Sequence, residues 1–464
     1  MIRLFNRYWA VPAVVSLVIE GLLLYAAVPL ATHLRLGIVG PGTPPPSSTV
    51  VVDALTFSII GLLCLYANSL YDFGERLSSR DLMIRLLRTF SILAVASWAL
   101  YFVVPMVQTG RGVFALALCF GMSFVIAWRV VLRWVLRSEG FAERILIIGA
   151  DEKAIDIARE TLARKHLGYR VVGFLDDDPR LQGVSILNPR VIGTTAQACQ
   201  LALQHGATRV VVAAMDYRGR LSMDALLHCK TSGIRVQEGS SYYEQLTGKI
   251  MIEGLRKSWL IFSDGFVVSR GTLFAKRLLD ILVAGVGLVL ALPFMLLVAL
   301  AVRLDSPGPI FFSQERVGRG WRSFTVWKFR SMRTDAEAGG AVWAVQGDPR
   351  VTRVGRFIRK TRLDELPQLW NVLNGDMSLV GPRPERRMFV DQLQEQCQWY
   401  EQRLVVRPGL TGWAQIKAPY ASTFEESIEK LKFDLFYIKN LSLFLDISIL
   451  LSTARIVLLG RGAR

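Results

Sequence analysis

Four long apolar stretches fill the first 137 residues of this 464-residue chain, and they constrain its fold more than any other feature. They lie at about Tyr8–Ala31, Val50–Tyr71, Leu82–Val104 and Val113–Val135. Each is close to the roughly 20 residues that a helix needs to cross a bilayer. The pattern therefore predicts a four-helix transmembrane domain over residues 1–138. With 52% hydrophobic and 20% charged residues, the composition excludes a disordered chain and argues against a wholly soluble one.

Cations around these stretches predict their orientation. Arg3 and Arg7 precede the first stretch, further arginines flank the second connection (Arg76, Arg80, Arg85, Arg88), and others close the fourth stretch. Because cytoplasmic loops are enriched in Lys and Arg, we expect both ends of this domain in the cytoplasm. Arg85, Arg88 and Arg129 lie near the ends of spans, so we expect their side chains to snorkel to lipid headgroups.

A different pattern, of alternating strand-like and helical segments, begins at Arg144. Short apolar runs lie at 144–149, 169–175, 209–213 and 234–237. This alternation predicts a parallel, Rossmann-like α/β domain over residues 140–268. Gly149 ends a strand and opens a helix as in a dinucleotide-binding motif, but Asp151 and Glu152 follow it and would repel a pyrophosphate. We therefore hypothesise that this domain binds no cofactor strongly.

The third region, residues 270–464, starts with an apolar segment that differs from the first four. Ile281–Val302 is 22 residues long and carries no charge, with cations just before it and Arg303 just after it. Cations at both ends favour a cytoplasmic position for both ends. Pro293 lies inside the segment, where proline kinks a helix. We predict a re-entrant membrane helix over 273–302 in an α/β domain; the pattern alone leaves a kinked crossing helix open.

Asp364 and Glu365 form the densest chemical motif, because they stand side by side among arginines and lysines. A carboxylate beside such cations stays ionised and can act as a nucleophile or metal ligand, while the cations can hold a diphosphate. A solvated surface cluster is the alternative for an isolated Asp-Glu pair. Pro382 and Pro384 stiffen the loop around Arg383 and suit its guanidinium to phosphate recognition, although an ordinary proline-rich turn would look the same.

Several motifs of the third region together resemble one family. They are Lys276-Arg277-x-x-Asp280, 306–312 (SPGPIFF), 328–332 (KFRSM), 363–368 (LDELPQ), 371–378 (NVLNGDMS), 381–384 (GPRP) and 407–415 (RPGLTGWAQ). In this order they resemble the bacterial monotopic sugar-phosphate transferases, which move a sugar-1-phosphate from a UDP-sugar to polyprenyl phosphate. The four spans and the α/β domain resemble the large form of that family. The opening residues 1–9 resemble its exopolysaccharide branch associated with exosortase systems.

The resemblance implies an integral membrane phosphoglycosyl transferase that initiates exopolysaccharide or related glycan synthesis. Asp364 would attack the donor, release UMP and form a covalent aspartyl–phosphosugar intermediate, and Glu365 would hold Mg²⁺. The implied phosphate-binding residues are Arg359, Arg383, Lys276, Arg277, Lys328, Arg330 and Arg407. The implied supporting residues are Asp280, Pro293, Pro382, Pro384, Asp376, Trp413 and Gln415. Undecaprenyl phosphate would be the acceptor. The resemblance also implies a multi-pass protein in the bacterial inner membrane, in contact with membrane lipids, with its active site facing the cytoplasm. A homodimer is the oligomeric state that it suggests.

Two other functions fit parts of the sequence less well. A membrane-tethered nucleotide-sugar epimerase or dehydratase needs Tyr-x-x-x-Lys, but Tyr217, Tyr242 and Tyr243 have no lysine four positions on. A non-enzymatic basic scaffold would explain the net charge of +17, but a nucleic-acid binder wants its cations on one open face rather than around two carboxylates. We therefore expect no nucleic-acid partner. The identity of the sugar does not follow from the sequence.

Overall fold

The computed structural model describes residues 2–4, 7–37, 47–73, 77–103, 110–138, 142–213, 222–253, 255, 257–336, 348–418 and 423–458. Arg76 and Tyr217 lie outside the described residues. By internal contacts the chain divides into two compact units: residues 1–2 with Tyr8–Thr247, and residues 3–7 with Gly248–Arg464. The predicted limits of the three domains stay predictions.

Four long helices in the first unit match the four apolar stretches. They are α1 (Val11–Gly37), α2 (Ser47–Ala67), α3 (Ser79–Val103) and α4 (Arg111–Arg137), preceded by the short strands β1 (Ile2–Leu4) and β2 (Arg7–Trp9). Each helix is long and apolar enough to cross a membrane. Leu24, Phe57 and Leu93 belong to one buried core that the helices share, whereas Leu22 and Trp98 are exposed. Apolar side chains on both the inner and outer faces are what a membrane-embedded bundle requires.

The expectation that Arg129 reaches the headgroups is wrong. Its side chain is 7% exposed and forms an ion pair with Glu20 of α1, whose side chain is fully buried; the shortest distance, from Nε to Oε1, is 2.5 Å. A second nitrogen, Nη1, donates to the carbonyl of Leu70 at 2.6 Å. A buried charge needs a partner in this way, and the distant position of Glu20 in the sequence concealed the pairing.

The α/β part of the first unit has five parallel strands in the order β5-β4-β3-β6-β7, which is the Rossmann arrangement. The strands are β3 (Glu143–Ile148), β4 (Tyr169–Leu175), β5 (Val191–Gly193), β6 (Arg209–Val212) and β7 (Arg235–Glu238). The helices are α5 (Glu152–Ala163), α6 (Ala198–Gln204), α7 (Met223–Thr231) and α8 (Gly239–Thr247). The predicted parallel sheet is confirmed, with β5 added at one edge.

The second unit packs short strands and helices around one long helix. Its strands are β8 (Phe311–Val317), β9 (Ser323–Phe329), β10 (Ser378–Val380) and β11 (Gly409–Thr411). Its helices are α9 (Lys257–Phe262), α10 (Arg270–Asp305), α11 (Arg353–Lys360), α12 (Gln368–Asn374), α13 (Arg387–Gln396), α14 (Trp413–Lys417), α15 (Phe424–Lys439) and α16 (Leu443–Leu458). In the sequence, the antiparallel pair β8–β9 and the parallel pair β10–β11 lie on either side of residues 363–365.

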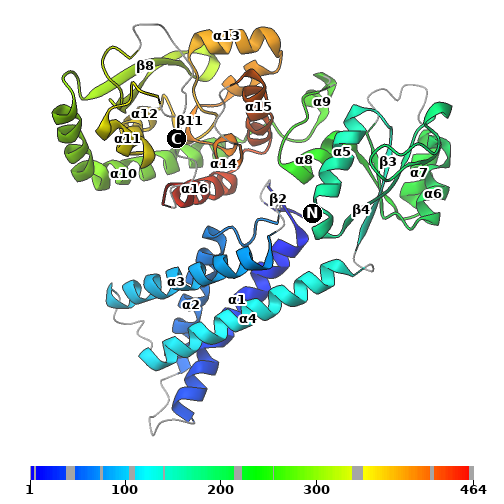
Figure 1. Ribbon diagram of the computed structural model, residues 1–464, viewed down its shortest axis with the longest axis horizontal. Helices are drawn as coiled ribbons and strands as arrows, with labels where there is room; N and C mark the ends of the chain where they lie inside the picture. Colours follow the sequence, from blue (N-terminus) through cyan, green and yellow to red (C-terminus); the bar gives the residue numbers. More distant parts are fainter. Residues whose placement is uncertain are drawn as a thin grey trace. The chain divides into compact units, whose positions relative to one another are not determined.

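Both ends of α10 contact this same unit. Near its start, Lys276 donates to the carbonyl of Val380 at 2.9 Å. Near its end, Val302 joins a buried cluster with Phe329 and Ile358. A straight 36-residue helix would be about 54 Å long, and Figure 1 shows α10 bending between two arms instead. The side chains around Pro293 are largely exposed and apolar, so the middle of the helix is the part suited to lipid.

Candidate active site

Asp364 and Glu365 lie on a single 3-10 turn, η6 (Leu363–Glu365), between α11 and α12. The chain reverses at Arg362, whose φ of 60° lies in the left-handed region. A residue other than glycine is strained there, so the surrounding fold must hold this turn in place. Pro367 immediately precedes α12, so the two carboxylates lie before that helix rather than in its first turn.

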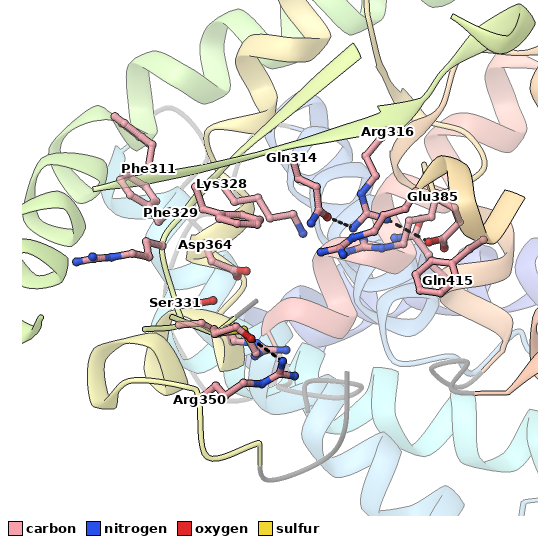
Figure 2. Close-up of a pocket in the computed structure, with 18 of the residues that line it drawn as sticks. Phe311, Gln314, Arg316, Lys328, Phe329, Ser331, Arg350, Asp364, Glu385 and Gln415 are labelled. Atoms are coloured by element: carbon pink, nitrogen blue, oxygen red, sulfur yellow. Dashed lines mark hydrogen bonds and ion pairs between the residues drawn. The ribbon is translucent and has the colours of Figure 1, made fainter. Parts of the chain in front are cut away.

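The turn opens into a cavity of about 410 Å³. Figure 2 shows Asp364 facing it beneath Lys328 and Phe329 of β9, with Arg316 of β8 and Glu385 farther along the wall. Six predicted site residues line the cavity: Asp364, Arg359, Arg383, Lys328, Arg330 and Gln415. The lining also includes polar residues outside the predicted set of site residues, namely Gln314, Arg316, Arg350, Arg403 and Asp434. Cations and carboxylates thus share one cavity large enough for part of a nucleotide-sugar.

Two cations hold Glu365 in the ionised form. Arg383 donates through Nη2 to Oε1 of Glu365 at 2.7 Å, and Nζ of Lys328 donates to the same oxygen at 3.0 Å. Burial alone would raise the pKa of Glu365, but Arg383 and Lys328 outweigh burial and hold it well below its usual range. Burial also lowers the pKa of Lys328, although Glu365 opposes that effect.

Asp364 has the opposite electrostatic environment. It is 8% exposed, and among the described residues its buried Oδ1 has no hydrogen-bond partner. Burial, followed by the negative charge of Glu365, raises the pKa of Asp364 to about 6. A carboxylate with an unused oxygen at the wall of a cationic cavity is poised to bond to an incoming group.

Glu365 is not itself in the described lining, but it bonds to Lys328 and Arg383, which are. The other predicted residues lie away from the cavity, as judged from the same lining. Lys276 is buried and bonded to Asp446 at 2.7 Å, and Arg277 donates to the last carbonyls of α12 at 2.6 and 2.7 Å. Asp280 accepts bonds from Ser378 and Leu379. These contacts fasten α10 to the unit. The other outlying residues are Arg407, Asp376, Pro293, Pro382, Pro384 and Trp413; of these, Trp413 donates to the carbonyl of Gly248 at 2.9 Å.

The carboxylates fit Mg²⁺ only in company with a phosphate ligand. Among the described residues, no group of three or more His, Cys, Asp or Glu side chains could form a cage by itself. Mg²⁺ is commonly held by one or two carboxylates, water and substrate phosphates, rather than by protein alone. Asp364, with its unpartnered oxygen, and the ionised Glu365 are the donors that such an ion would use.

Comparison with known proteins assigns the family. Residues 271–460 match the family model described as bacterial sugar transferase, and residues 68–227 match one described as CoA-binding domain. Undecaprenyl-phosphate glucose phosphotransferase of Komagataeibacter xylinus is 31% identical over 90% of this chain and 85% of its own length. The chain belongs to the bacterial sugar transferase family. The five helices of membrane-spanning length within the described ranges agree with a membrane-bound member that carries a Rossmann-like domain.

Two further relatives of this transferase carry different sugars in their names. UDP-glucose:undecaprenyl-phosphate glucose-1-phosphate transferase of Xanthomonas campestris pv. campestris is 32% identical over 75% of this chain and 74% of its own length. UDP-N-acetylgalactosamine-undecaprenyl-phosphate N-acetylgalactosaminephosphotransferase of Aeromonas hydrophila is 46% identical over 52% of this chain. The match spans 56% of the Aeromonas protein. Family membership therefore leaves the sugar open.

Proposed function

We propose that this transferase moves a sugar-1-phosphate from a UDP-sugar to undecaprenyl phosphate, releases UMP and thereby initiates an exopolysaccharide or related glycan. The observation that carries the proposal is Asp364. It is a buried carboxylate with one oxygen that has no partner in the described part of the chain, in a cavity lined by Lys328, Arg359 and Arg383. The relatives are named for this class of reaction.

In the first step, an oxygen of Asp364 attacks the phosphorus attached to the sugar. A bond forms from that oxygen to phosphorus, the bond to the bridging oxygen of the diphosphate breaks, and UMP leaves with the electron pair. In the second step, a phosphate oxygen of undecaprenyl phosphate attacks the same phosphorus and Asp364 departs as a carboxylate. Because a carboxylate is a weak nucleophile, positioning and charge neutralisation must supply most of the rate.

Arg359, Arg383 and Lys328 supply fixed positive charge around the donor diphosphate. Glu365 keeps Lys328 and Arg383 directed into the cavity through its two ionic hydrogen bonds. Mg²⁺, held by Glu365 with Asp364, would neutralise further diphosphate charge when bound. In this proposal, the cations lie where the leaving UMP gains negative charge.

We further infer that α10 is re-entrant and that the active site faces the cytoplasm at the inner membrane. The contacts at Lys276 and Val302 hold both ends of the helix on the catalytic unit, which supports a turn within one leaflet. A cysteine placed after Val302 should react only with reagents that reach the cytoplasm. Labelling from the opposite side would contradict the re-entrant helix. A homodimer stays a prediction, which light scattering in detergent would test.

The test of the reaction uses purified protein, Mg²⁺, undecaprenyl phosphate and a panel of UDP-sugars, with UMP release as the measurement. We expect release with at least one UDP-sugar, its loss in Asp364→Asn and a severe reduction in Glu365→Gln. Without the acceptor, intact mass spectrometry should find one phosphosugar added at Asp364. Turnover in Asp364→Asn, or turnover with no such adduct, would remove the covalent mechanism.

For the Rossmann-like domain, we propose the fold without a strongly bound cofactor. Its own carboxylates occupy the backbone donors that would otherwise meet a pyrophosphate: Asp151 accepts from Ala154 at 2.9 Å, and Asp176 accepts from Ala150 at 3.0 Å. Titration of the full chain with NAD(P) and nucleotide-sugars, in the presence of saturating UMP to block the catalytic cavity, tests this. Micromolar binding that Asp151→Ala or Asp176→Ala alters would refute it.

A further inference from the structure

The loop that carries Arg383 is fixed by hydrogen bonds to four successive carbonyl oxygens. The amide of Gly409 donates to the carbonyl of Pro382 (2.9 Å), and the side chain of Arg403 donates to the carbonyl of Arg383 (2.8 Å). The side chain of Arg316 donates to the carbonyl of Pro384 (3.3 Å), and the amide of Val317 donates to the carbonyl of Glu385 (3.0 Å). Two prolines in the loop restrict its backbone further. Of the two side-chain donors, only Arg403 acts on the backbone of Arg383 itself.

Arg403 is a buried cation on the 3-10 turn η7 (Tyr400–Val405), with a side chain that is 8% exposed. Its Nη2 lies 3.1 Å from Oδ2 of Asp434 on α15, whose side chain is 4% exposed. Its Nη1 donates to the hydroxyl of Tyr400, and its guanidinium carbon lies 4.9 Å from the centre of that ring. Asp434 and Tyr400 thus fix the guanidinium plane from two sides.

A continuous chain of contacts joins this cluster to the reacting carboxylates. Asp434 holds Arg403, Arg403 holds the carbonyl of Arg383, and the side chain of Arg383 binds Glu365, the neighbour of Asp364. A buried ion pair is costly to desolvate and is a weak source of stability by itself. In this pair, however, Arg403 also donates to the backbone carbonyl of Arg383, next to the reaction centre. This contact gives the pair a role in positioning Arg383.

We propose that Arg403, oriented by Asp434, is a positioning residue that sets where the Arg383 guanidinium meets the donor diphosphate. This rests on the proposed sugar-phosphate transfer and adds a pair of residues to it. Nη2 of Arg403 meets both Asp434 and the Arg383 carbonyl, while Nη1 meets Tyr400. A lysine at 403 keeps the positive charge, but its single nitrogen cannot hold all three groups in the geometry of a planar guanidinium. Small displacements of a charged group cost rate because transition-state contacts require close geometry.

The test is a double-mutant cycle on UMP release with Arg403→Lys, Arg383→Gln and the double variant. We expect Arg403→Lys to lower kcat by roughly tenfold to a hundredfold with KM for the UDP-sugar little changed. In the Arg383→Gln background, the same substitution should cause no further loss, because the group it positions is gone. Arg387→Lys is the matched control: that arginine also faces a ring, Trp321 at 5.6 Å, and a carboxylate, Asp391 at 3.8 Å, but its side chain is 62% exposed.

The outcomes separate this inference from the reaction itself. If wild-type protein releases no UMP from any UDP-sugar, the proposed reaction fails. If wild-type protein is active and the losses from Arg403→Lys and Arg383→Gln multiply in full, only the positioning role is overturned. Should Arg403→Lys melt well below the control, the cycle is repeated with Asp434→Asn, which keeps Arg403 and removes its ionic partner. In that cycle too, adding Asp434→Asn to Arg383→Gln should cause no further loss of UMP release.

Discussion

Replacing Asp364 by asparagine should make the protein more stable at pH 8, although the proposed mechanism requires it to abolish transfer. Burial raises the pKa of this carboxyl from 3.8 to about 6. Above about pH 6 both the folded and unfolded states carry the charge, and the folded state bears the full cost of burying it. Each tenfold change in acid dissociation is worth about 1.4 kcal/mol, so the cost is roughly 3 kcal/mol. Asparagine has nearly the same shape and no charge.

The pH dependence distinguishes this cost from a packing effect. Below its unfolded pKa of 3.8 the carboxyl is protonated in both states and costs nothing. As pH rises from about 4 to 6, the unfolded state ionises first, so the wild type loses stability relative to Asp364→Asn. At about pH 5 roughly half of the 3 kcal/mol remains. If a change in packing caused the stability difference, that difference would be the same at pH 5 and pH 8.

Thermal unfolding in detergent, with EDTA to remove divalent ions, measures the difference. The Asp364→Asn protein should melt about 5 to 10 °C above wild type at pH 8 and by clearly less at pH 5. Asp391→Asn is the control, since that side chain is 50% exposed and should shift stability by no more than about 0.5 kcal/mol. A melting temperature of Asp364→Asn at or below that of wild type at pH 8 would refute the reasoning.

Two further predictions concern the pH dependence of UMP release and the buried ion pair between Arg129 and Glu20. Wild-type UMP release should fall as pH drops through about 6, because Asp364 attacks only when ionised and its protonated form dominates below that pKa. The profile of kcat/KM against pH measures this, and a flat profile between about pH 8 and pH 5 would contradict it. Replacing Arg129 by methionine should destabilise the first unit by about 3–5 kcal/mol, since Glu20 is left buried without its cation. Adding Glu20→Gln should recover much of that loss in detergent unfolding, and equal losses in the single and double variants would show that the pair is not the cause.

Elements of regular hydrophobic pattern were predictable from the sequence. The strands β3, β4, β6 and β7 came from short apolar runs, because each is buried in a parallel sheet. The edge strand β5 has only three residues and gives too short a pattern to notice. The apolar residues of 434–458 likewise do not mark the break near Asn440 that separates α15 from α16.

At the site, local motifs predicted the carboxylates and the nearest cations but missed the groups that orient them. Asp364 and Glu365 stand together in the sequence, and the two prolines flag Arg383. Arg403 and Asp434 belong to no such motif, and 30 residues of chain separate them. Their pairing exists only because η7 and α15 meet behind the Arg383 loop. Tertiary contacts of this kind leave no periodic or local signal.

The cations at the start of α10 show why charge alone does not identify a phosphate site. A basic side chain near a membrane helix can meet a phosphate, but it can equally meet helix-terminal carbonyls, which carry partial negative charge. Arg277 does the latter at the end of α12, and Lys276 pairs with Asp446 in the interior. Both residues therefore act on the position of α10. A rigid joint at this end of α10 is what the proposed re-entrant helix needs, because its exposed apolar middle provides no specific contacts to set its direction.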